Sequence, residues 1–341
     1  MARRLREIRY RQQESVERES KDDSKKTTIE EFKATKEEAQ NWKEKAKKIY
    51  FTEYKKLIII PIVILILSLI QIGYQIATTG DFINKGVSLR GGATISFTAA
   101  ESNINLLSLQ EELKAETSNG DIIVRKIGSR GVIIEAGVYE NEELQKLIDL
   151  IQAKTGIEKS QYSIEIMGST LGKSFFRQAF LAMIIAFALM AIVVFVIFRT
   201  FVPSIAVILA AFSDIVITIA FVNLMGIKVS TAGIAAFLML IGYSVDTDIL
   251  LTIRVLKRKE GSVEDRIIIS MKTGLTMTVT AMASAIVVLI FSKSEVLTQI
   301  MTILLIGLIA DIINTWIQNV GILKWYLEKK QRGVEVYNEA G

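Results

Sequence analysis

The chain has 341 residues, of which 50% are hydrophobic and 23% are charged, and its formal net charge is +5. It contains no cysteine and no histidine, which excludes disulfides, thiol nucleophiles and zinc sites built from those ligands. No Walker A pattern occurs, so direct use of ATP is not expected. We expect no enzyme activity, no metal and no cofactor, and proton handling would fall to carboxylates. The basic residues gather beside apolar segments, where anionic lipid and membrane topology explain them, so nucleic-acid binding is not expected.

The first 56 residues are dense in charges of both signs. Within them, Thr27 or Thr28 followed by Glu30 and Glu31 fits a capped helix start. We interpret this tail as a solvated or lipid-surface helix that leads into the membrane. It does not have the short basic and apolar pattern of a signal peptide, so we expect the first apolar run to be an anchor.

Six apolar runs are long enough to cross a bilayer, which takes about 20 mostly apolar residues. They lie at 57–78, 178–198, 201–225, 229–253, 274–291 and 297–326, the last as a span with a helical extension. When the runs are threaded alternately, the segments rich in Lys and Arg fall on one side, which predicts cytoplasmic termini. The expected plan is a cytoplasmic tail at 1–56, a first membrane helix at 57–78, an extracytoplasmic domain at 79–176, a five-helix membrane core at 177–326 and a cytoplasmic tail at 327–341.

The extracytoplasmic segment predicts a small α+β domain. ATISFTAA alternates as a strand, NINLLSLQEELKAETS has helical spacing, and DIIVRKIGSRGVIIEAGV gives two strands around a turn. A helix, YENEELQKLIDLIQAKTG, and a strand, YSIEIMG, complete the order strand, helix, strand, strand, helix, strand. That order is the ferredoxin-like pattern. We interpret Glu101, Glu135 and Glu165 as solvent-facing charges of this domain.

Four carboxylates interrupt the apolar runs: Asp214, Asp246, Asp248 and Asp311. A charge inside a spanning helix is expensive and persists mainly where it pairs, lines a wet cavity or handles ions and protons. Asp246 and Asp248 point about 200° apart on a helix, so only one of them can face a given partner. We expect Asp246, the deeper one, to be the functional acid, while Asp248 reaches the cytoplasmic interface or pairs with Arg254. The alternative for these acids is a structural role as hydrogen-bonding groups between helices.

Polar residues also recur at helical spacing in the last two runs. The fifth carries Thr273, Thr276, Thr280 and Ser284, and the sixth carries Gly307, Asp311, Asn314 and Gln318. We expect both stripes, together with Arg254, to lie at helix interfaces, where they can face the acids.

Three segments carry a resemblance to a known family. KGVSLRGGATISF, which contains Gly91 and Gly92, resembles the motif that opens the first outer domain in SecD and SecF, accessory subunits of the general protein-export channel. IGYSVDTDILLTIRVLK, with Gly242 and Tyr243, resembles the fourth-helix motif of SecF, and FSDIVITIA around Asp214 resembles its third helix. One helix, a large outer domain and five further helices resemble the SecF half of the pair, which has a core of the resistance-nodulation-division (RND) type. The similarity covers roughly residues 50–326 and is greatest to archaeal members.

Two positions depart from the bacterial form of the family. Bacterial members have Asn-Asp where this chain has Asp246 and Thr247, so either Asp246 or Asp248 is the counterpart of the family acid. Near the start of the fifth helix, bacterial members have an arginine implicated in proton transfer, and this chain has Met277. Separately, we expect Gly91 and Gly92 to allow a sharp turn between the linker and the first strand.

The resemblance implies a multi-pass subunit of the cell membrane, in contact with lipid, that assists export of secreted polypeptides through the Sec channel. It implies pairing with a SecD-like subunit. Asp214, Asp246, Asp248 and Asp311 are the candidates for coupling to the proton-motive force, since one charge crossing the membrane releases about 2.3 kcal/mol per 100 mV. Two alternatives stay open: a half-size RND-type secondary transporter for a small solute or lipid, and a non-energised scaffold of the channel complex.

Overall fold

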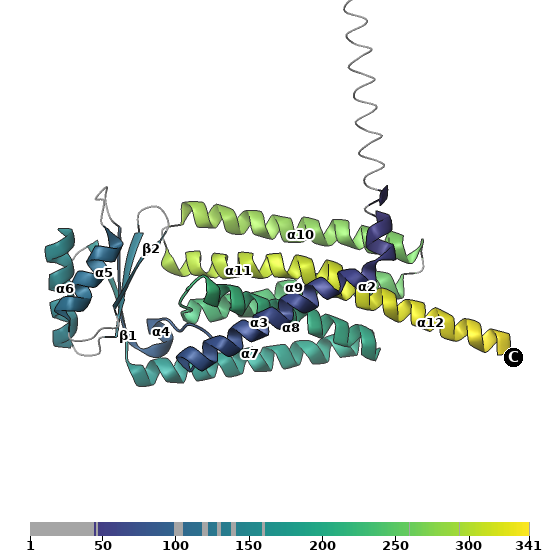
Figure 1. Ribbon diagram of the computed structural model, residues 1–341, viewed down its shortest axis with the longest axis horizontal. Helices are drawn as coiled ribbons and strands as arrows, with labels where there is room; N and C mark the ends of the chain where they lie inside the picture. The colour runs from purple at the N-terminus through teal and green to yellow at the C-terminus, as the bar shows by residue number, and fades with distance from the viewer. Residues whose placement is uncertain are drawn as a thin grey trace, which may run out of the picture. The chain divides into compact units, whose positions relative to one another are not determined.

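The computed structural model describes residues 44, 45, 47–98, 105–117, 122–127, 131–137, 141–158, 161–258, 260–292 and 294–340. The chain divides into two units, Met1–Tyr54 and Lys55–Gly341. In the first unit, residues 47–52 are helical. The helix start expected near Thr27 and the charge at Glu101 lie outside the described residues. The second unit contains a helix bundle and a four-stranded sheet (Figure 1).

Within the described residues, six helices are long and apolar enough to cross a membrane. The first comprises α2 (Tyr54–Leu57) and α3 (Ile59–Thr79), followed by α7 (Ser169–Phe198), α8 (Phe201–Leu224), α9 (Thr231–Lys257) and α10 (Val263–Phe291). The last is formed by α11 (Glu295–Ile313), the π-helix η2 (Asn314–Asn319) and α12 (Val320–Ala340). Each of the six apolar runs in the sequence lies within one of these helices or ends within a few residues of it.

Two helices begin well before their apolar run. α7 starts at Ser169, and α10 starts at Val263 behind a capping box in which Ser262 and Asp265 each bond the other's backbone N–H. Such a cap satisfies the free N–H groups of a first turn, so the helix can begin in polar sequence. Hydropathy marks the part of a helix that crosses hydrocarbon, and the helix itself is longer.

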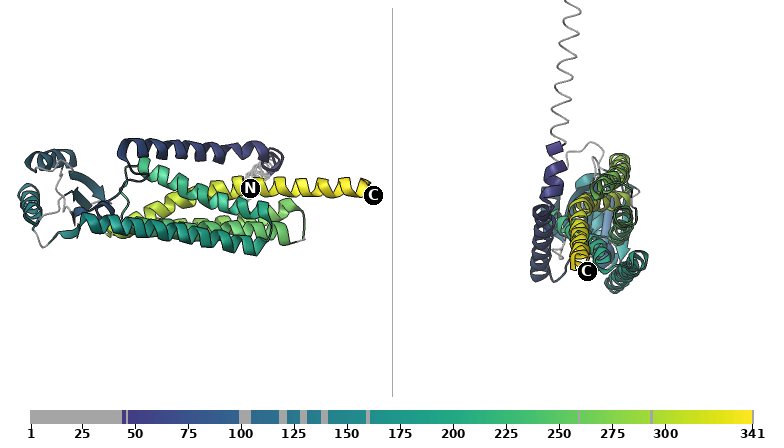
Figure 2. Two further views of the ribbon diagram at one scale, coloured as in Figure 1. Left: turned by 90° about the horizontal axis from the view of Figure 1, so that it is seen from below. Right: turned by 90° about the vertical axis from the view of Figure 1, so that its right-hand side faces the viewer.

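α8 is the most enclosed of the spanning helices, and it contacts α3, α7, α9 and α11. α3 lies along one flank of the bundle (Figure 2). Most of its apolar side chains are exposed. Exposed apolar surface is what lipid covers in a membrane protein, so α8 forms the interior and α3 the periphery.

The sheet has the order β2-β3-β1-β4, and every neighbouring pair is antiparallel. Its elements along the chain are β1 (Gly92–Thr98), α5 (Leu106–Glu116), β2 (Ile122–Ile127), β3 (Gly131–Ala136), α6 (Asn141–Thr155) and β4 (Ser163–Met167). This confirms the predicted ferredoxin-like order. α5 and α6 cover one face of the sheet (Figure 1). Between these helices and the sheet, Ile95, Ile134 and Leu147 are fully buried.

A double-glycine turn joins the short helix α4 (Val87–Arg90) to β1. Gly91 and Gly92 have φ of 97° and 124°, which L side chains rarely adopt. An added Cβ at Gly91 would lie 2.5 Å from Ser169 Cα, and one at Gly92 would lie 2.4 Å from the Ala136 carbonyl oxygen. The turn therefore needs glycine at both positions, as the sequence predicts.

The segment before this turn is tied to the loop between α8 and α9. Gly86 N–H donates to the Val229 carbonyl at 2.8 Å, and Val229 N–H donates to the Asn84 carbonyl at 2.7 Å. The Asn223 side chain donates to the Phe82 carbonyl at 2.9 Å. These bonds connect the start of the α+β domain to the ends of two membrane helices.

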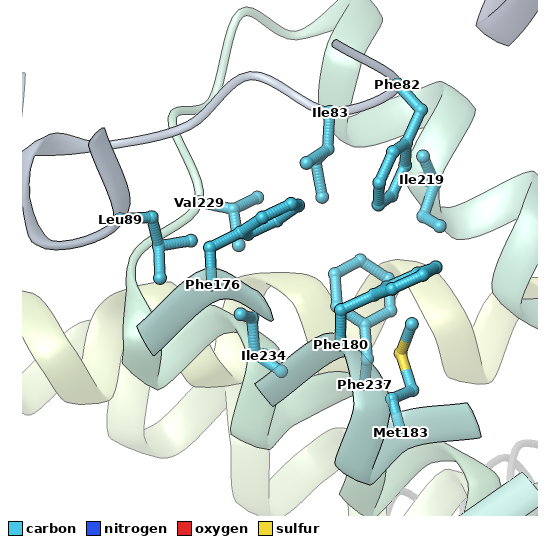
Figure 3. A pocket seen from close by; sticks show the side chains of 10 residues that line it. All are labelled: Phe82, Ile83, Leu89, Phe176, Phe180, Met183, Ile219, Val229, Ile234 and Phe237. Carbon is cyan, nitrogen blue, oxygen red and sulfur yellow. The ribbon is translucent and has the colours of Figure 1, made fainter. Parts of the chain in front are cut away.

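Beside this connection lies an apolar cavity of about 20 Å³ (Figure 3). Its lining is Phe82, Ile83, Leu89, Phe176, Phe180, Met183, Ile219, Val229, Ile234 and Phe237. The Phe176 ring packs against Phe82 and Phe180, and the Lys85 amine lies 4.2 Å from its centre. A void of this size and polarity is a packing gap, because small apolar cavities stay dry.

Candidate functional site

Three carboxyl groups meet in the interior of the bundle: Asp214 on α8, Asp248 on α9 and Asp311 on α11. All three side chains are fully buried. Asp214 accepts hydrogen bonds from Ser244 Oγ at 2.5 Å and from Asn314 Nδ2 at 2.7 Å. One carboxyl group thereby connects α8 to α9 and to η2.

Asp248 and Asp311 share a hydroxyl group. Thr315 Oγ1 lies 2.9 Å from Asp248 Oδ1 and 3.0 Å from Asp311 Oδ1. A hydroxyl has one hydrogen to donate and can accept other bonds. Both contacts are fully formed only when one of the two carboxyl groups carries a proton and donates it to Thr315.

A second hydroxyl repeats this arrangement. Thr247 Oγ1 donates to the Ser244 carbonyl at 2.8 Å and lies 3.3 Å from Asp311 Oδ2. Its single hydrogen is therefore already directed at Ser244. Asp311 contacts both the Thr247 and the Thr315 hydroxyl. A proton on Asp311 could therefore form a hydrogen bond to one of these two hydroxyl oxygens.

The π-helix η2 supplies much of the polar lining. Its Asn314, Thr315, Gln318 and Asn319 are all buried, and Asn319 Nδ2 donates to Asp248 Oδ1 at 2.7 Å. π-helical turns are rare and occur mostly at functional sites. The i to i+5 bonding of η2 widens the helix, so four polar residues of a six-residue segment lie in the interior.

The site is rich in oxygen atoms and poor in cations. Among the described residues, no lysine or arginine forms an ion pair with Asp214, Asp248 or Asp311. Four buried side-chain oxygens of the cluster also accept no hydrogen bond within the described chain: Asp248 Oδ2, Asn314 Oδ1, Gln318 Oε1 and Asn319 Oδ1. Three uncompensated negative charges could not be buried at low cost. The arrangement is suited to holding protons.

The structure separates the two neighbouring acids of α9. Asp248 is buried in the cluster, whereas Asp246 is exposed on the outside of the bundle, as are Gly242 and Tyr243. The angle between the acids is as predicted, but Asp248 rather than Asp246 meets Asp214 and Asp311. Asp248 does not pair with Arg254, which instead donates at 3.0 Å to the Ile269 carbonyl and to Thr273 on α10.

Asn314 and Gln318 lie in the cluster interior, and the Gln318 amide contacts Ser213 at 3.5 Å. Thr276 and Thr280, which the sequence predicts at a helix interface where they can face the acids, do not contact Asp214, Asp248 or Asp311. Both are exposed, and their hydroxyls donate to the Lys272 and Thr276 carbonyls of their own helix. Helical spacing identified the stripe, but its direction depends on how α10 packs. Met277, also on α10, is 45% exposed.

Sequence reasoning did not select Ser244, Thr247, Thr315 and Asn319, although the side chain of each contacts a carboxyl group of the cluster. Their signal was present, since each is a polar residue within an apolar run. A serine or threonine in a membrane helix usually bonds its own backbone, so the residue type alone does not mark a site.

A second group of charges lies between the sheet and the α8–α9 loop, and we call it the joint: the partly buried Arg125 on β2, the buried Glu135 on β3 and the partly buried Lys228 in the loop. The interpretation of Glu135 as solvent-facing is wrong, because Glu135 is 5% exposed. It forms ion pairs with Arg125 and, at 2.7 Å, with Lys228. Arg125 also donates to the Gly226 carbonyl at 3.2 Å. Burial lowers the pKa of the Lys228 amine, and the Glu135 carboxylate acts in the opposite direction.

Comparison with known proteins shows which family this chain resembles. Residues 147–329 match the family described as "Protein export membrane protein SecD/SecF, C-terminal". The chain is 40% identical over 280 residues to the protein-export membrane protein SecF of Methanothermobacter thermautotrophicus, covering 81% of this chain and 93% of that protein. It is 42% identical over 284 residues to SecF of Methanocaldococcus jannaschii, covering 81% and 96%.

Solved structures agree at the level of the fold. A crystal structure of SecDF from Thermus thermophilus, described as a translocon-associated membrane protein, matches with a TM-score of 0.66 at 19% identity. The match covers 81% of this chain and 38% of the SecDF chain. SecDF in a super-membrane-facing form matches with a TM-score of 0.52, also at 19% identity.

The six membrane-length helices and the ferredoxin-like domain define a polytopic membrane protein with the fold of a protein-export subunit. The chain belongs to the SecF family of protein-export membrane proteins.

Proposed function

We propose that this chain assists protein export, working with a SecD-like subunit at a Sec channel through which secreted polypeptides pass. Membership of the SecF family supports the export role, and the Thermus SecDF chain supports the pairing, because its matching region is only 38% of a longer chain. In this proposal the chain is a non-enzymatic membrane subunit surrounded by lipid.

The orientation in this proposal follows the basic residues. Arg199 follows the last residue of α7, and the segments 254–266 and 324–332 include the end of α9, the start of α10 and part of α12. These parts of the helices lie away from the sheet (Figure 1). Positive loops stay in the cytoplasm. Both termini would then be cytoplasmic, and the domain at 79–176 extracytoplasmic. Because the chain has no native cysteine, single introduced cysteines can test this with membrane-impermeant thiol reagents.

The acid cluster is the proposed coupling site. The observation that carries the proposal is that Asp214, Asp248 and Asp311 are fully buried and linked by shared hydroxyls, with no cation paired to them in the described chain. Gaining or losing a proton there changes which group donates, and therefore how α8, α9 and α11 hold together. A membrane potential supplies about 2.3 kcal/mol per charge per 100 mV, enough to bias two packing states.

Export of a secretory reporter tests the proposal in cells that lack this chain and are complemented with variants. We expect Asp214→Asn, Asp248→Asn and Asp311→Asn each to reduce export at normal membrane abundance. Asp149→Asn, the same change on the exposed face of α6, is the matched control and should export like the wild type.

The outcomes separate the candidate functions. Loss of export in the cluster variants alone supports a coupled subunit. Normal export in all of them would leave a non-energised scaffold and remove the coupling role. If the wild-type chain itself does not restore export, the export role fails and a small-solute transporter becomes the better reading of the buried acids.

A further inference from the structure

A cavity of about 270 Å³ lies at the joint, and we call it the joint cavity. β2, β3, the loop between α8 and α9, and the start of α11 line it, with Arg125, Glu135, Lys228 and Thr302 among the lining residues. A single water needs only about 10–15 Å³ of such space. The joint cavity therefore has room for a chemical group much larger than a water molecule.

The charged side chains that line the joint cavity do not balance. Among the described lining residues, Arg125, Lys126 and Lys228 are cationic, whereas Glu135 alone is anionic. Three positive charges against one negative charge leave a net charge of +2. A cavity with this balance favours an anionic ligand.

The cations also retain hydrogen-bond donors that the protein does not use. The Lys228 amine has three N–H groups, and Glu135 is its one partner within the described chain. Arg125 has five N–H groups, and its contacts are with Glu135 and the Gly226 carbonyl. Lys126 is exposed and forms no ion pair among the described residues. Donors from all three cations are therefore available to a ligand.

The electrostatics of Lys228 show the same excess of positive charge. Burial lowers the pKa of its amine, Glu135 raises it, and the nearby charges of Arg90 and Arg125 lower it. Glu135 thus compensates a group of cations only in part. A phosphate group would supply the missing negative charge, and Arg and Lys form short charge-assisted hydrogen bonds to phosphate oxygens.

The depth of the joint cavity in a membrane is that of lipid headgroups. α8 has 24 residues and is about 36 Å long, whereas the hydrocarbon core is about 30 Å thick. A centred α8 therefore ends, at Leu224, about 3 Å beyond the hydrocarbon, within a headgroup layer of roughly 5–7 Å. The lining residues of the α8–α9 loop follow directly from this end. Lipid phosphates occupy the same layer.

Exposed apolar side chains lie beside the joint cavity. Leu224 and Met225, at the end of α8, are 69% and 59% exposed, and Leu297, near the start of α11, is 44% exposed. Met225 also lines the joint cavity. A lipid can place its acyl chains against such residues while its phosphate reaches the cations. This combination favours a lipid over a soluble anion or an acidic polypeptide.

We infer that the joint cavity binds the phosphate group of an anionic phospholipid, held by Lys228, Arg125 and Lys126. The bound headgroup contacts both β2 and the α8–α9 loop. It therefore adds a link between the α+β domain and the membrane surface to the ion pairs of the joint. The inference depends on the membrane helices and the joint cavity, and it is independent of the export role.

Native mass spectrometry of the full chain in detergent tests the inference. The probes are dioleoyl phosphatidylglycerol, which is anionic, dioleoyl phosphatidylcholine, which is zwitterionic, and inorganic phosphate. We expect the wild type to retain phosphatidylglycerol at least tenfold more tightly than phosphatidylcholine. Inorganic phosphate at the same concentration should neither bind nor displace the lipid, because it has no acyl chains.

Two variants change the joint cavity in independent ways. Lys126→Gln removes an exposed cation and should weaken phosphatidylglycerol binding about fivefold, the contribution expected of one lysine near an anionic lipid surface. Lys146→Gln, the same change on the exposed face of α6, is the matched control and should bind like the wild type. Thr302→Phe fills the joint cavity and should weaken binding more than tenfold. The Thr302 hydroxyl bonds only its own helix, so this change breaks no contact between elements.

Four results would overturn the inference. Equal binding of the two lipids would show that the joint cavity does not select an anion. Unchanged phosphatidylglycerol binding in both Lys126→Gln and Thr302→Phe would place the lipid elsewhere. Inorganic phosphate that binds as tightly as the lipid would identify a site for a soluble anion. A soluble acidic peptide that binds the wild type more tightly than the lipid, and is weakened by Lys126→Gln, would identify a polypeptide site. Reporter export tests the proposed function separately.

Discussion

Truncating Glu135 should release the α+β domain from the membrane helices. Glu135 is 5% exposed and holds Lys228, whose side chain is 12% exposed, together with Arg125, whose side chain is 31% exposed. Removing one member of a buried ion pair costs about 3–5 kcal/mol, because the other charge is left uncompensated. Arg125 retains part of its hydration, so we take the lower end, about 3 kcal/mol, for Glu135→Ala. That corresponds to roughly a 100-fold increase in the open fraction of the joint.

Hydrogen–deuterium exchange on the full chain in lipid nanodiscs measures this opening. The reporters are the amides of Gly86 and Val229, which bond across the same contact. We expect them to exchange about 100-fold faster in Glu135→Ala, while amides of the β1–β3 ladder keep their protection. The double variant Glu135→Gln with Lys228→Met should recover most of the protection, because it leaves no unpaired charge in the loop.

Two results would refute this reasoning. Reporter exchange within twofold of the wild type in Glu135→Ala would show that the ion pairs do not hold the joint. A double variant as open as the single one would show that the loss comes from altered packing rather than from the orphaned charge of Lys228.

Three further predictions concern the joint, the glycine turn and the shared hydroxyl. The Lys228 amine should have a lower pKa than the Lys154 amine, because burial lowers the pKa of Lys228 whereas Glu112 and Glu116 raise that of Lys154. The rate of acetylation as a function of pH measures both. The pKa of Lys228 is lower in the folded protein than in the unfolded chain, so its charged form lowers the stability of the fold, and this stability is regained as the pH rises between the two pKa values. A pKa of Lys228 above that of Lys154 would contradict this prediction. Gly91→Ala should lower stability by about 1–3 kcal/mol, measured as thermal denaturation in detergent, whereas Gly73→Ala, with open space around it, should not. Thr315→Val should reduce reporter export and Thr315→Ser should retain it; equal export would show that the shared hydroxyl is dispensable.

The sequence predicted the elements well because the signals that define them are local. Each spanning helix appears as an apolar run, and each strand of the domain appears as a short alternating or apolar segment between turn residues. Even the turn at Gly91 and Gly92 followed from backbone sterics alone. The order of the elements then fixed the ferredoxin-like topology.

The sequence did not determine which way the polar residues face. It identified Asp214, Asp311 and Asn314 because they interrupt apolar runs, but Asp246 and Asp248 interrupt the same run and only packing distinguishes them. Glu135 was misplaced for a related reason. Its strand, GVIIEA, has adjacent apolar residues, and such a run indicates a strand buried on both faces. The group that buries Glu135 lies in a loop some 90 residues later, where no local pattern could reveal it.

The acid cluster and the joint are linked through two helices that carry both. Asp214 lies on α8 and Asp248 on α9, and the loop between these helices contains Lys228 and Val229. This loop holds the domain by the ion pair between Lys228 and Glu135 and by backbone bonds to the segment at Asn84 and Gly86. In the proposed function, protonation of the cluster changes the packing of α8 against α9. It would therefore move the loop between them, which is bonded to the sheet through Lys228. A non-energised scaffold would require only that the joint hold the domain in place. A coupled subunit would also require that the acid cluster and the joint lie on the same pair of helices, and in this chain α8, α9 and their connecting loop carry both.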